Sequence, residues 1–361
     1  MLAAERRSLI LQQARSEGSV RVADLVDRLR VSDVTIRRDL DFLAVEGLVT
    51  KVHGGAVLVA DPVPEPVAVT PASEGTLTVG VLLPSSIYYF KRIIEGINGV
   101  LAANDARLTL AVSNYRAADE PRLVSDLLKA GAQALLLTPS AESGPESAWV
   151  GRLPVPAVLV ERRMTDQEAT GLSWVRIAHE RGAAMAVEHL HALGHTRIGL
   201  FIRGDTPTAI SVRTGWREAL VRLGLDEDVP CESGLDIPGW PHWSAEDATR
   251  FLSRLRKENA TALLCHSDED ALALAQHCRS AGISVPDDLS IIASGNELAE
   301  FTTPSLTCIA PPKTQVGALA ARTLLDLLAA PGTAAAVHID LEPSLITRAS
   351  TAAAKPYKKR R

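Results

Sequence analysis

The longest part of the chain alternates short apolar runs with amphipathic segments. From Leu77 to about Ala349, short apolar runs are separated by segments in which apolar positions recur every three or four residues. The first pattern is typical of buried strands and the second of helices that bury one face. We expect strands at 77–83, 108–112, 134–138, 157–160, 197–202, 261–265 and 289–293. We expect helices near 90–104, 119–130, 180–193, 209–223, 244–257, 268–281 and 314–329. This order predicts an α/β fold with parallel sheets.

The alternation is interrupted once, between about Val160 and His179, and then starts again. Hydrophobic cores stop growing as chains lengthen, and long chains divide into smaller units. We therefore expect two similar lobes in tandem rather than one large sheet.

The first 58 residues have a different pattern, with short helical segments followed by two β-like arms. Helices are expected at about Ala4 to Arg15, at about Ala23 to Leu29, and over 33–47. Ser32 follows a tight turn and is placed to cap the third helix. Residues 48–58 form two arms around a glycine-rich turn, as in a β-hairpin. This order predicts a winged helix-turn-helix, whose third helix enters the major groove of DNA.

The third helix carries arginines away from its buried side. Ile36, Leu40 and Leu43 repeat at helical spacing and define the core stripe, whereas Arg38 points away from it and Arg37 flanks it. An isolated pair of arginines is more often a solvated helix face, and that alternative stays open. Here the pair occurs together with the turn and the wing. The predicted DNA-binding residues are Ser32, Thr35, Arg37, Arg38, Lys51, His53, Gly54 and Gly55.

Charge and composition limit the class of protein. The chain has 361 residues, is 46% hydrophobic and carries a formal net charge of −5, which excludes a uniformly basic nucleic-acid coat. The first 58 residues, called the head below, contain nine basic and eight acidic residues. With so small a net charge, their positive side chains must act locally. No apolar run approaches the roughly 18 residues of a membrane helix, and the N-terminus lacks a signal-peptide pattern, so we expect a cytoplasmic protein without a membrane partner. The four cysteines form no CxxC and are expected to be free, mostly buried thiols.

Two segments are expected to lack a core of their own. Residues 59–76 form a linker in which four prolines occur within 60–76. The basic tail, 350–361, is expected to be disordered.

The head resembles the DeoR-type helix-turn-helix. The resemblance covers residues 5–58 and is carried by Val31-Ser32, by Thr35 to Leu40 (TIRRDL) and by Val52 to Ala56 (VHGGA). It implies that Thr35, Arg37 and Arg38 contact DNA and that the wing touches the DNA backbone.

The larger part, 77–349, resembles the ligand-binding part of LacI/GalR-type repressors, which has the periplasmic-binding-protein fold. The phrases EHLHALGHTRIGLF (188–201) and GISVPDDLSII (282–292) are the most specific, and VGVLLP, GWREAL and TPSLTCIAPP also match. The resemblance implies one lobe of about 77–176 and 310–332, a second of about 177–309 and 333–349, and a small sugar-like effector bound between them. The hinge helix that normally joins LacI-type modules has no counterpart in the proline-rich linker.

Candidate ligand residues follow the ends of predicted strands, where ligands bind in such folds. Three successive aromatics after the first strand suit stacking on a sugar or base, although part of this group could pack under the following helix. The resemblance adds arginines, an aromatic and polar residues at later strand ends. The predicted set is Ser85, Tyr88, Tyr89, Phe90, Asn114, Arg162, Arg213, Trp243, Ser267, Asp268, Asn296 and Glu297. Ala178 and Gly295 stand where the family often has acidic residues, so a typical hexose is not assumed.

Catalytic and metal chemistry find little support. His189, His191 and His195 do not share one helix face, and the Cys265-His266 and His277-Cys278 pairs fit core thiols and surface imidazoles better than metal ligands. The chain shows no nucleophile elbow, Walker loop or dinucleotide motif, so we expect no catalytic residue, no metal and no cofactor.

The sequence therefore predicts a ligand-responsive transcription regulator. It is expected to act as a repressor and a homodimer on double-stranded operator DNA, with a sugar or sugar derivative as effector. Two alternatives remain, a sugar- or nucleoside-processing enzyme with a regulatory head and a solute-binding protein without a regulatory role.

Overall fold

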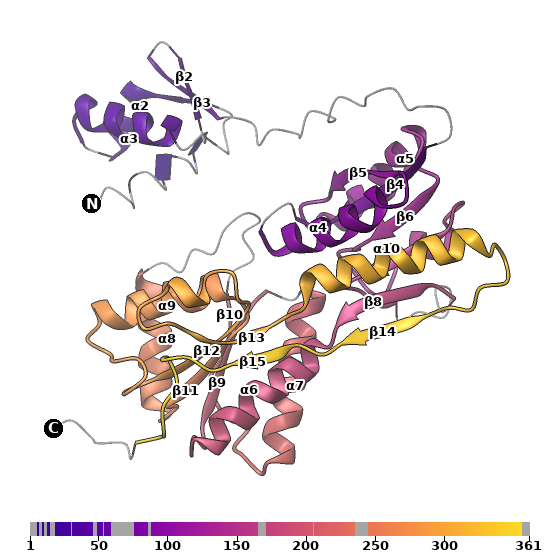
Figure 1. Ribbon diagram of the computed structural model, residues 1–361. Coiled ribbons are helices and arrows are strands. Elements are labelled where there is room, and N and C mark those ends of the chain that lie inside the picture. Colours follow the sequence, from indigo (N-terminus) through magenta and orange to yellow (C-terminus); the bar gives the residue numbers. More distant parts are fainter. Residues whose placement is uncertain are drawn as a thin grey trace. The chain divides into compact units, whose positions relative to one another are not determined.

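The computed structural model divides the chain into two compact units, Met1–Gly75 and Thr76–Arg361 (Figure 1). The boundary falls at the end of the proline-rich segment. The structure describes residues 6, 9–10, 13–14, 19–29, 31–45, 49–52, 54–58, 76–85, 88–164, 171–204, 206–234 and 245–355. The first predicted helix lies mostly outside these residues, as does the tail after residue 355. The expected disorder is wrong for the start of the tail, because Ser350 is fully buried and its hydroxyl donates to the Ile291 carbonyl at 2.6 Å.

The described residues of the smaller unit include two bounded helices and an antiparallel sheet with strand order β1-β3-β2, and residues 6, 9–10 and 13–14 of the first predicted helix are also helical. Its elements are β1 (Ser19–Arg21), α2 (Val22–Leu29), α3 (Asp33–Val45), β2 (Val49–Val52) and β3 (Gly55–Leu58). Ile36, Leu40 and Leu43 of α3 are buried in one core with residues of α2 and the sheet, as the apolar stripe predicted. The predicted third helix and hairpin are thus present.

The larger unit has two six-stranded sheets, one in each lobe. In lobe 1 the order is β14-β8-β7-β6-β4-β5, and every pairing is parallel. In lobe 2 the order is β10-β9-β11-β12-β13-β15, and only β15 pairs antiparallel. The lobe 1 strands are β4 (Leu77–Leu83), β5 (Ala106–Val112), β6 (Ala134–Leu137), β7 (Ala157–Val160), β8 (Ser173–Ile177) and β14 (His338–Leu341). The lobe 2 strands are β9 (Ile198–Arg203), β10 (Cys231–Gly234), β11 (Ala262–Cys265), β12 (Ser290–Ser294), β13 (Thr307–Ala310) and β15 (Ser344–Ile346).

Helices cover both faces of each sheet, because the central strands are apolar on both sides. In lobe 1, α4 and α10 share one core with the sheet, and α5 packs in the other. In lobe 2, α6 and α7 share one core, and α8 and α9 share the other. The helices are α4 (Tyr88–Ala102), α5 (Glu120–Lys129), α6 (His179–Ala192), α7 (Pro207–Arg222), α8 (Ala245–Lys257), α9 (Asp268–Ser280) and α10 (Lys313–Ala329). In the part of the chain that the structure describes, no helix is long and apolar enough to cross a membrane.

The chain passes between the lobes after β8, after β13 and after β14. One predicted lobe boundary is therefore wrong. We expected residues 333–349 in lobe 2, but β14 pairs with β8 at the edge of the lobe 1 sheet, and only the following β15 joins lobe 2. The reason is that β14 pairs with the backbone of β8, a strand that the sequence pattern had not predicted.

Candidate DNA-binding surface and ligand-binding junction

The start of α3 is fixed by a side-chain cap. The Thr35 backbone N–H donates to Ser32 Oγ at 3.3 Å, and the Ser32 and Thr35 hydroxyls lie 2.8 Å apart. The cap predicted at Ser32 is confirmed. The two hydroxyls hydrogen-bond to each other at the N-terminal end of α3, the end that a helix-turn-helix presents to DNA.

The two arginines of α3 are both exposed, and they differ in their partners. Arg37 forms an ion pair with Asp33 one turn earlier, in which Nη2 donates to Oδ2 at 3.2 Å. The hydrogen bond to Arg37 lowers the pKa of Asp33, and the same bond raises the pKa of Arg37. Arg38 forms no ion pair or side-chain hydrogen bond with the described residues, so its guanidinium is available to a phosphate or a base.

The wing is held close to α3 and β1. Lys51 of β2 forms an exposed ion pair with Asp41 of α3. Gly54 has φ +81° at the hairpin turn, which only glycine adopts readily. A Cβ on Gly55 would lie 2.1 Å from the carbonyl oxygen of Val20, so this glycine is required by the close approach of β1. The predicted His53 lies outside the described residues.

In lobe 1, the aromatic group after β4 divides between the core and the junction of the lobes. Phe90 is only 3% exposed and packs in the lobe 1 core, so its predicted role as a ligand-stacking residue is wrong. The reason is helical geometry, because successive residues of α4 point in different directions. Tyr89 is half-buried, and its hydroxyl donates to Glu161 Oε2 at 3.0 Å. The side chain of Tyr88 lies outside the described residues, and Ser85 is buried directly after β4.

Glu161 is a central residue of this junction that sequence reasoning missed. It follows β7 with φ +59°, an unusual backbone conformation for a residue with a side chain. Its carboxylate also lies 2.8 Å from His179 Nε2 and accepts the Ile177 backbone N–H at 3.2 Å. Burial acts to raise the pKa of Glu161, but these hydrogen bonds and the neighbouring positive charges hold it below its usual range. Arg162 was selected because it follows the end of a predicted strand, and the same criterion could have selected Glu161.

Arg162 is turned inward, with 1% of its surface exposed. Its Nε donates to the carbonyl of Pro139 at 2.8 Å and its Nη1 to the carbonyl of Glu161 at 2.7 Å. Nη1 also lies 3.5 Å from the Thr208 hydroxyl of lobe 2. The side chain thus links the ends of β6 and β7 in lobe 1 to the first turn of α7 in lobe 2. The predicted Asn114 is exposed, with φ +52°.

A second group missed in the sequence surrounds Glu120 at the start of α5. Its Oε1 accepts the Ser140 backbone N–H at 3.0 Å and the Ser140 hydroxyl at 2.7 Å. Its Oε2 is buried without a hydrogen-bond partner. Burial raises the pKa of this carboxyl against the hydrogen bonds from Ser140 and Ser113.

In lobe 2, Asp268 and Ser267 begin α9. Ser267 Oγ accepts the Asp270 backbone N–H at 3.1 Å and so caps the helix. Asp268 is 1% exposed and accepts the Leu298 backbone N–H at 2.7 Å. A Cβ on Gly295, which has φ +133°, would lie 3.0 Å from the Asp268 carboxyl, and this explains why no acidic side chain stands at residue 295.

The remaining predicted residues of lobe 2 have different surroundings. Asn296 Oδ1 accepts from Arg348 Nη2 at 2.5 Å, so this amide is used within the lobe. Glu297 lies 2.9 Å from Lys313 Nζ, a contact that the sequence did not indicate. Arg213 is half-buried on α7, and Trp243 lies outside the described residues.

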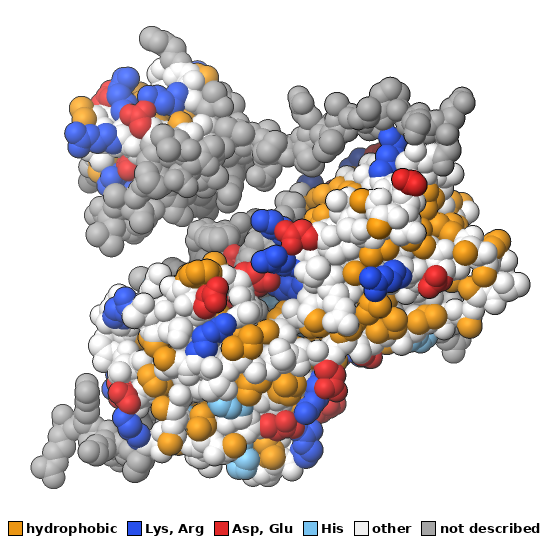
Figure 2. Space-filling view, in the orientation of Figure 1, with side chains coloured by type: hydrophobic (Ala, Val, Ile, Leu, Met, Phe, Trp, Pro, Cys, Tyr) orange, Lys and Arg blue, Asp and Glu red, His pale blue; other side chains and the backbone are white. Residues whose placement is uncertain are grey.

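An ionic cluster around Glu180 of α6 also joins the lobes. Arg176 of β8 donates to its carboxylate at 3.1 Å, Arg163 lies 3.4 Å away, and the Ser211 hydroxyl of α7 donates at 2.9 Å. Arg176 also pairs with Asp340 of β14 at 2.6 Å. Burial acts to raise the pKa of Glu180, but its hydrogen bonds and Arg176 keep it low. Figure 2 shows charged side chains of both signs gathered where the lobes meet.

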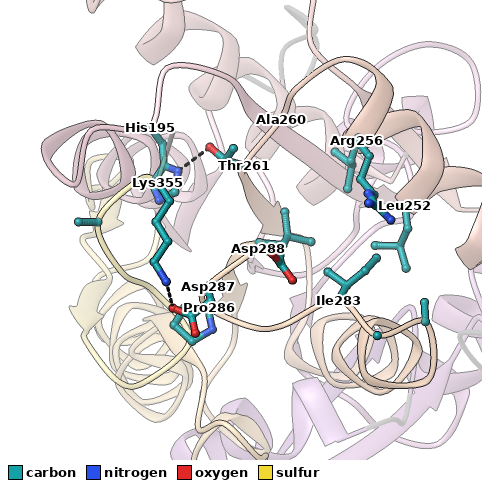
Figure 3. A pocket seen from close by; sticks show the side chains of 15 residues that line it. His195, Leu252, Arg256, Ala260, Thr261, Ile283, Pro286, Asp287, Asp288 and Lys355 are labelled. Carbon is teal, nitrogen blue, oxygen red and sulfur yellow. Dashed lines mark hydrogen bonds and ion pairs between the residues drawn. The ribbon is translucent and has the colours of Figure 1, made fainter. Parts of the chain in front are cut away.

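A cavity of about 520 Å³ lies at the opposite edge of the lobe 2 sheet, where β11 and β12 begin (Figure 3). Leu252, Ile283 and Pro286 contribute apolar surface to it, and Arg256 and Asp288 contribute charged groups. None of the predicted ligand residues lines this cavity. Among the described residues, no group of three or more His, Cys, Asp or Glu side chains is placed to hold a metal ion.

Comparison with known families accounts for both units. Residues 6–61 match the DeoR-like helix-turn-helix domain, and residues 187–351 match the periplasmic binding protein-like domain. The solved transcription regulator GntR from Chromobacterium violaceum is 26% identical, with a TM-score of 0.65, over 76% of this chain and 99% of that chain. The larger unit thus has the fold of solved LacI family transcriptional regulators, and the head matches a DeoR-like helix-turn-helix domain. The match of the head agrees with the DeoR-type resemblance, and the match over 187–351 agrees with the periplasmic-binding-protein fold expected for the larger part.

Several curated transcriptional regulators match the chain over nearly its whole length. An arabinose metabolism transcriptional repressor of Geobacillus stearothermophilus is 28% identical, covering 91% of this chain and 90% of the relative. The HTH-type transcriptional regulator MalR of Streptomyces coelicolor is 28% identical, covering 93% of this chain and 98% of the relative. A LacI family regulator from Enterococcus faecium, solved with bound ribose, has the same fold with a TM-score of 0.65 at 24% identity, over 77% of this chain and all of that chain. These relatives are transcriptional regulators rather than enzymes.

Proposed function

We propose that the protein is a transcriptional repressor of carbohydrate catabolism genes, and that a small sugar bound between its lobes changes its affinity for operator DNA. The observation that carries the proposal is the pairing of two features in one chain. One is an α3 helix with exposed arginines in a DeoR-like head. The other is a two-lobed body in which polar side chains from both lobes meet at the carboxyl ends of the strands, where α/β folds bind ligands.

The DNA-binding part of the proposal assigns roles residue by residue. Arg38 contacts a phosphate or a base edge directly, because it has no competing partner among the described residues. Arg37 contacts DNA after exchanging its ion pair with Asp33, and Lys51 contacts the backbone from the wing. Thr35 and His53 lie in the segments that resemble the DeoR-type DNA contacts. The regulator acts as a homodimer, since two heads then match two half-sites of an operator.

The effector part rests on the chemistry at the lobe junction. Carboxylates such as Glu297 and Asp268 accept hydrogen bonds from sugar hydroxyls, whereas Arg162 donates them. A relative named for arabinose metabolism and a fold relative with bound ribose support a pentose as the first class to test.

The test is selection of genomic DNA fragments by the full chain, followed by fluorescence anisotropy with the selected fragment. We expect nanomolar to submicromolar binding at moderate salt, lost in the R38A variant and changed by L-arabinose or D-ribose. Failure to select any fragment above non-specific background contradicts the DNA-binding part. Binding that no pentose changes contradicts the proposed effector class.

A further inference from the structure

Lys313 is a buried cation at one of the crossings between the lobes. It is the first residue of α10, which packs on lobe 1, and it follows β13 of lobe 2. Its side chain is only 3% exposed. An ammonium at the N-terminal end of a helix meets the unfavourable end of the helix dipole, and burial removes its hydration. Its position therefore depends on strong partners.

Two of its partners come from different lobes. Lys313 Nζ lies 2.9 Å from Glu297 Oε1, in the loop after β12 of lobe 2. The same Nζ lies 4.0 Å from the centre of the Tyr89 ring, on α4 of lobe 1, within the range of a cation–π contact. Tyr89 is itself held by the hydrogen bond from its hydroxyl to Glu161. One ammonium thus touches both lobes.

Both partners, an aromatic ring and a carboxylate, are groups that bind sugars. An aromatic ring receives the apolar face of a sugar, and a carboxylate accepts hydrogen bonds from its hydroxyls. Sequence position alone selects Tyr89 and Glu297 as ligand residues. In the structure the ring face and the carboxylate oxygen are already used by Lys313.

We propose that Lys313 is an internal competitor of the effector, whose ammonium occupies the place between Tyr89 and Glu297 that a sugar must enter. The inference rests on the proposed function, and it names a residue that sets the affinity of the site between the lobes for the sugar. Entry of the sugar displaces the ammonium from the Tyr89 ring and from Glu297. The contacts of Lys313 with the two lobes are thereby exchanged for contacts of Tyr89 and Glu297 with the sugar. Lys313 therefore lowers the affinity for the sugar and couples sugar binding to a rearrangement of the lobes.

The first test is calorimetric titration of the full chain with L-arabinose and D-ribose. The K313M variant keeps an unbranched side chain of similar length without the charge. We expect it to bind a pentose about tenfold more tightly than the wild type, because a tenfold change corresponds to about 1.4 kcal/mol, at the lower end for a hydrogen bond to a charged group. The matched control is K129M on the surface of α5, where the lysine side chain is 75% exposed, and it should bind as the wild type does.

The outcomes separate this inference from the proposed function. Equal or weaker pentose binding by K313M, with the wild type binding, overturns the competition and leaves the effector class intact. Binding by K313M but not by the wild type supports the competition. Absence of pentose binding by both overturns the effector class, and the inference falls with it.

A second test needs no variant and holds even if K313M does not fold. Lysine acylation with acetic anhydride, read by mass spectrometry, should leave Lys313 unmodified in buffer and modify it when a binding pentose is added. Lys129 serves as the internal reference and should react equally in both samples. Protection of Lys313 that is unchanged at saturating pentose overturns the proposal.

Discussion

The packing of α4 against α10 leads to a pair of opposite predictions for two glycines of one helix. Gly96 faces α10 so closely that a Cβ would lie 2.0 Å from the carbonyl oxygen of Thr314. Ordinary carbon–oxygen contacts are about 3.3 Å or longer, so G96A must move the helices apart by roughly 1 Å. Overpacking of this kind costs about 1–3 kcal/mol, and alanine recovers about 0.5–1 kcal/mol of helix propensity. We therefore expect G96A to lower the free energy of unfolding by up to about 2.5 kcal/mol, with a central value of about 1 kcal/mol.

Gly99 is the matched control, because a Cβ at this position meets nothing within 4 Å. G99A gains helix propensity without a clash and should raise stability by about 0.5–1 kcal/mol. Urea unfolding followed by circular dichroism measures both variants, and unchanged m-values justify the comparison. A G96A protein as stable as the wild type, or a destabilised G99A protein, would refute the description of this helix pair.

Three further predictions concern the head, the thiols and a buried acid. R38A should weaken DNA binding more than R37A, because Arg37 already has a carboxylate partner, and the salt dependence of log K should fall by about one unit for each lost phosphate contact; equal effects in anisotropy titrations would count against this assignment. Under native conditions a thiol reagent should modify the half-buried Cys231 first, since burial raises the pKa of Cys278 to about 12; mass spectrometry that finds Cys278 modified first would contradict it. Burial raises the folded-state pKa of Glu120, so the stability that its protonated form contributes is lost as pH rises through that value. The stability of E120Q relative to the wild type should therefore be greater at neutral pH than at pH 4. Thermal melts of both proteins with no such trend would contradict this prediction.

Several strands that are buried on both faces could be predicted, although the largely buried β8 and β13 inside the two sheets were missed. The ranges 77–83 and 157–160 match β4 and β7, because continuous apolar runs leave little doubt about a buried parallel strand. The edge strands β10, β14 and β15 were missed as well. Of these, β14 and β15 are short and largely exposed and carry no apolar run. Their presence depends on backbone pairing with distant strands, which no local pattern records.

The candidate site could be predicted only in part. The position at a strand end selected Arg162 and Glu297, which contact Thr208 and Lys313, and their role in ligand binding stays a prediction. Phe90 failed because its helix turns it into the core. Lys313 could not be found in this way, because it begins a helix and does not follow a strand directly, and because Tyr89 lies far away in sequence.

Thermodynamic linkage tests the central claim most directly. The affinity of the full chain for a pentose should be measured by calorimetry with and without a saturating amount of its selected DNA fragment. The account predicts two different dissociation constants, and the same factor should separate the DNA affinities measured with and without the sugar. Superimposable sugar titrations in the two conditions would contradict the claim that the two-lobed body controls the DNA-binding head.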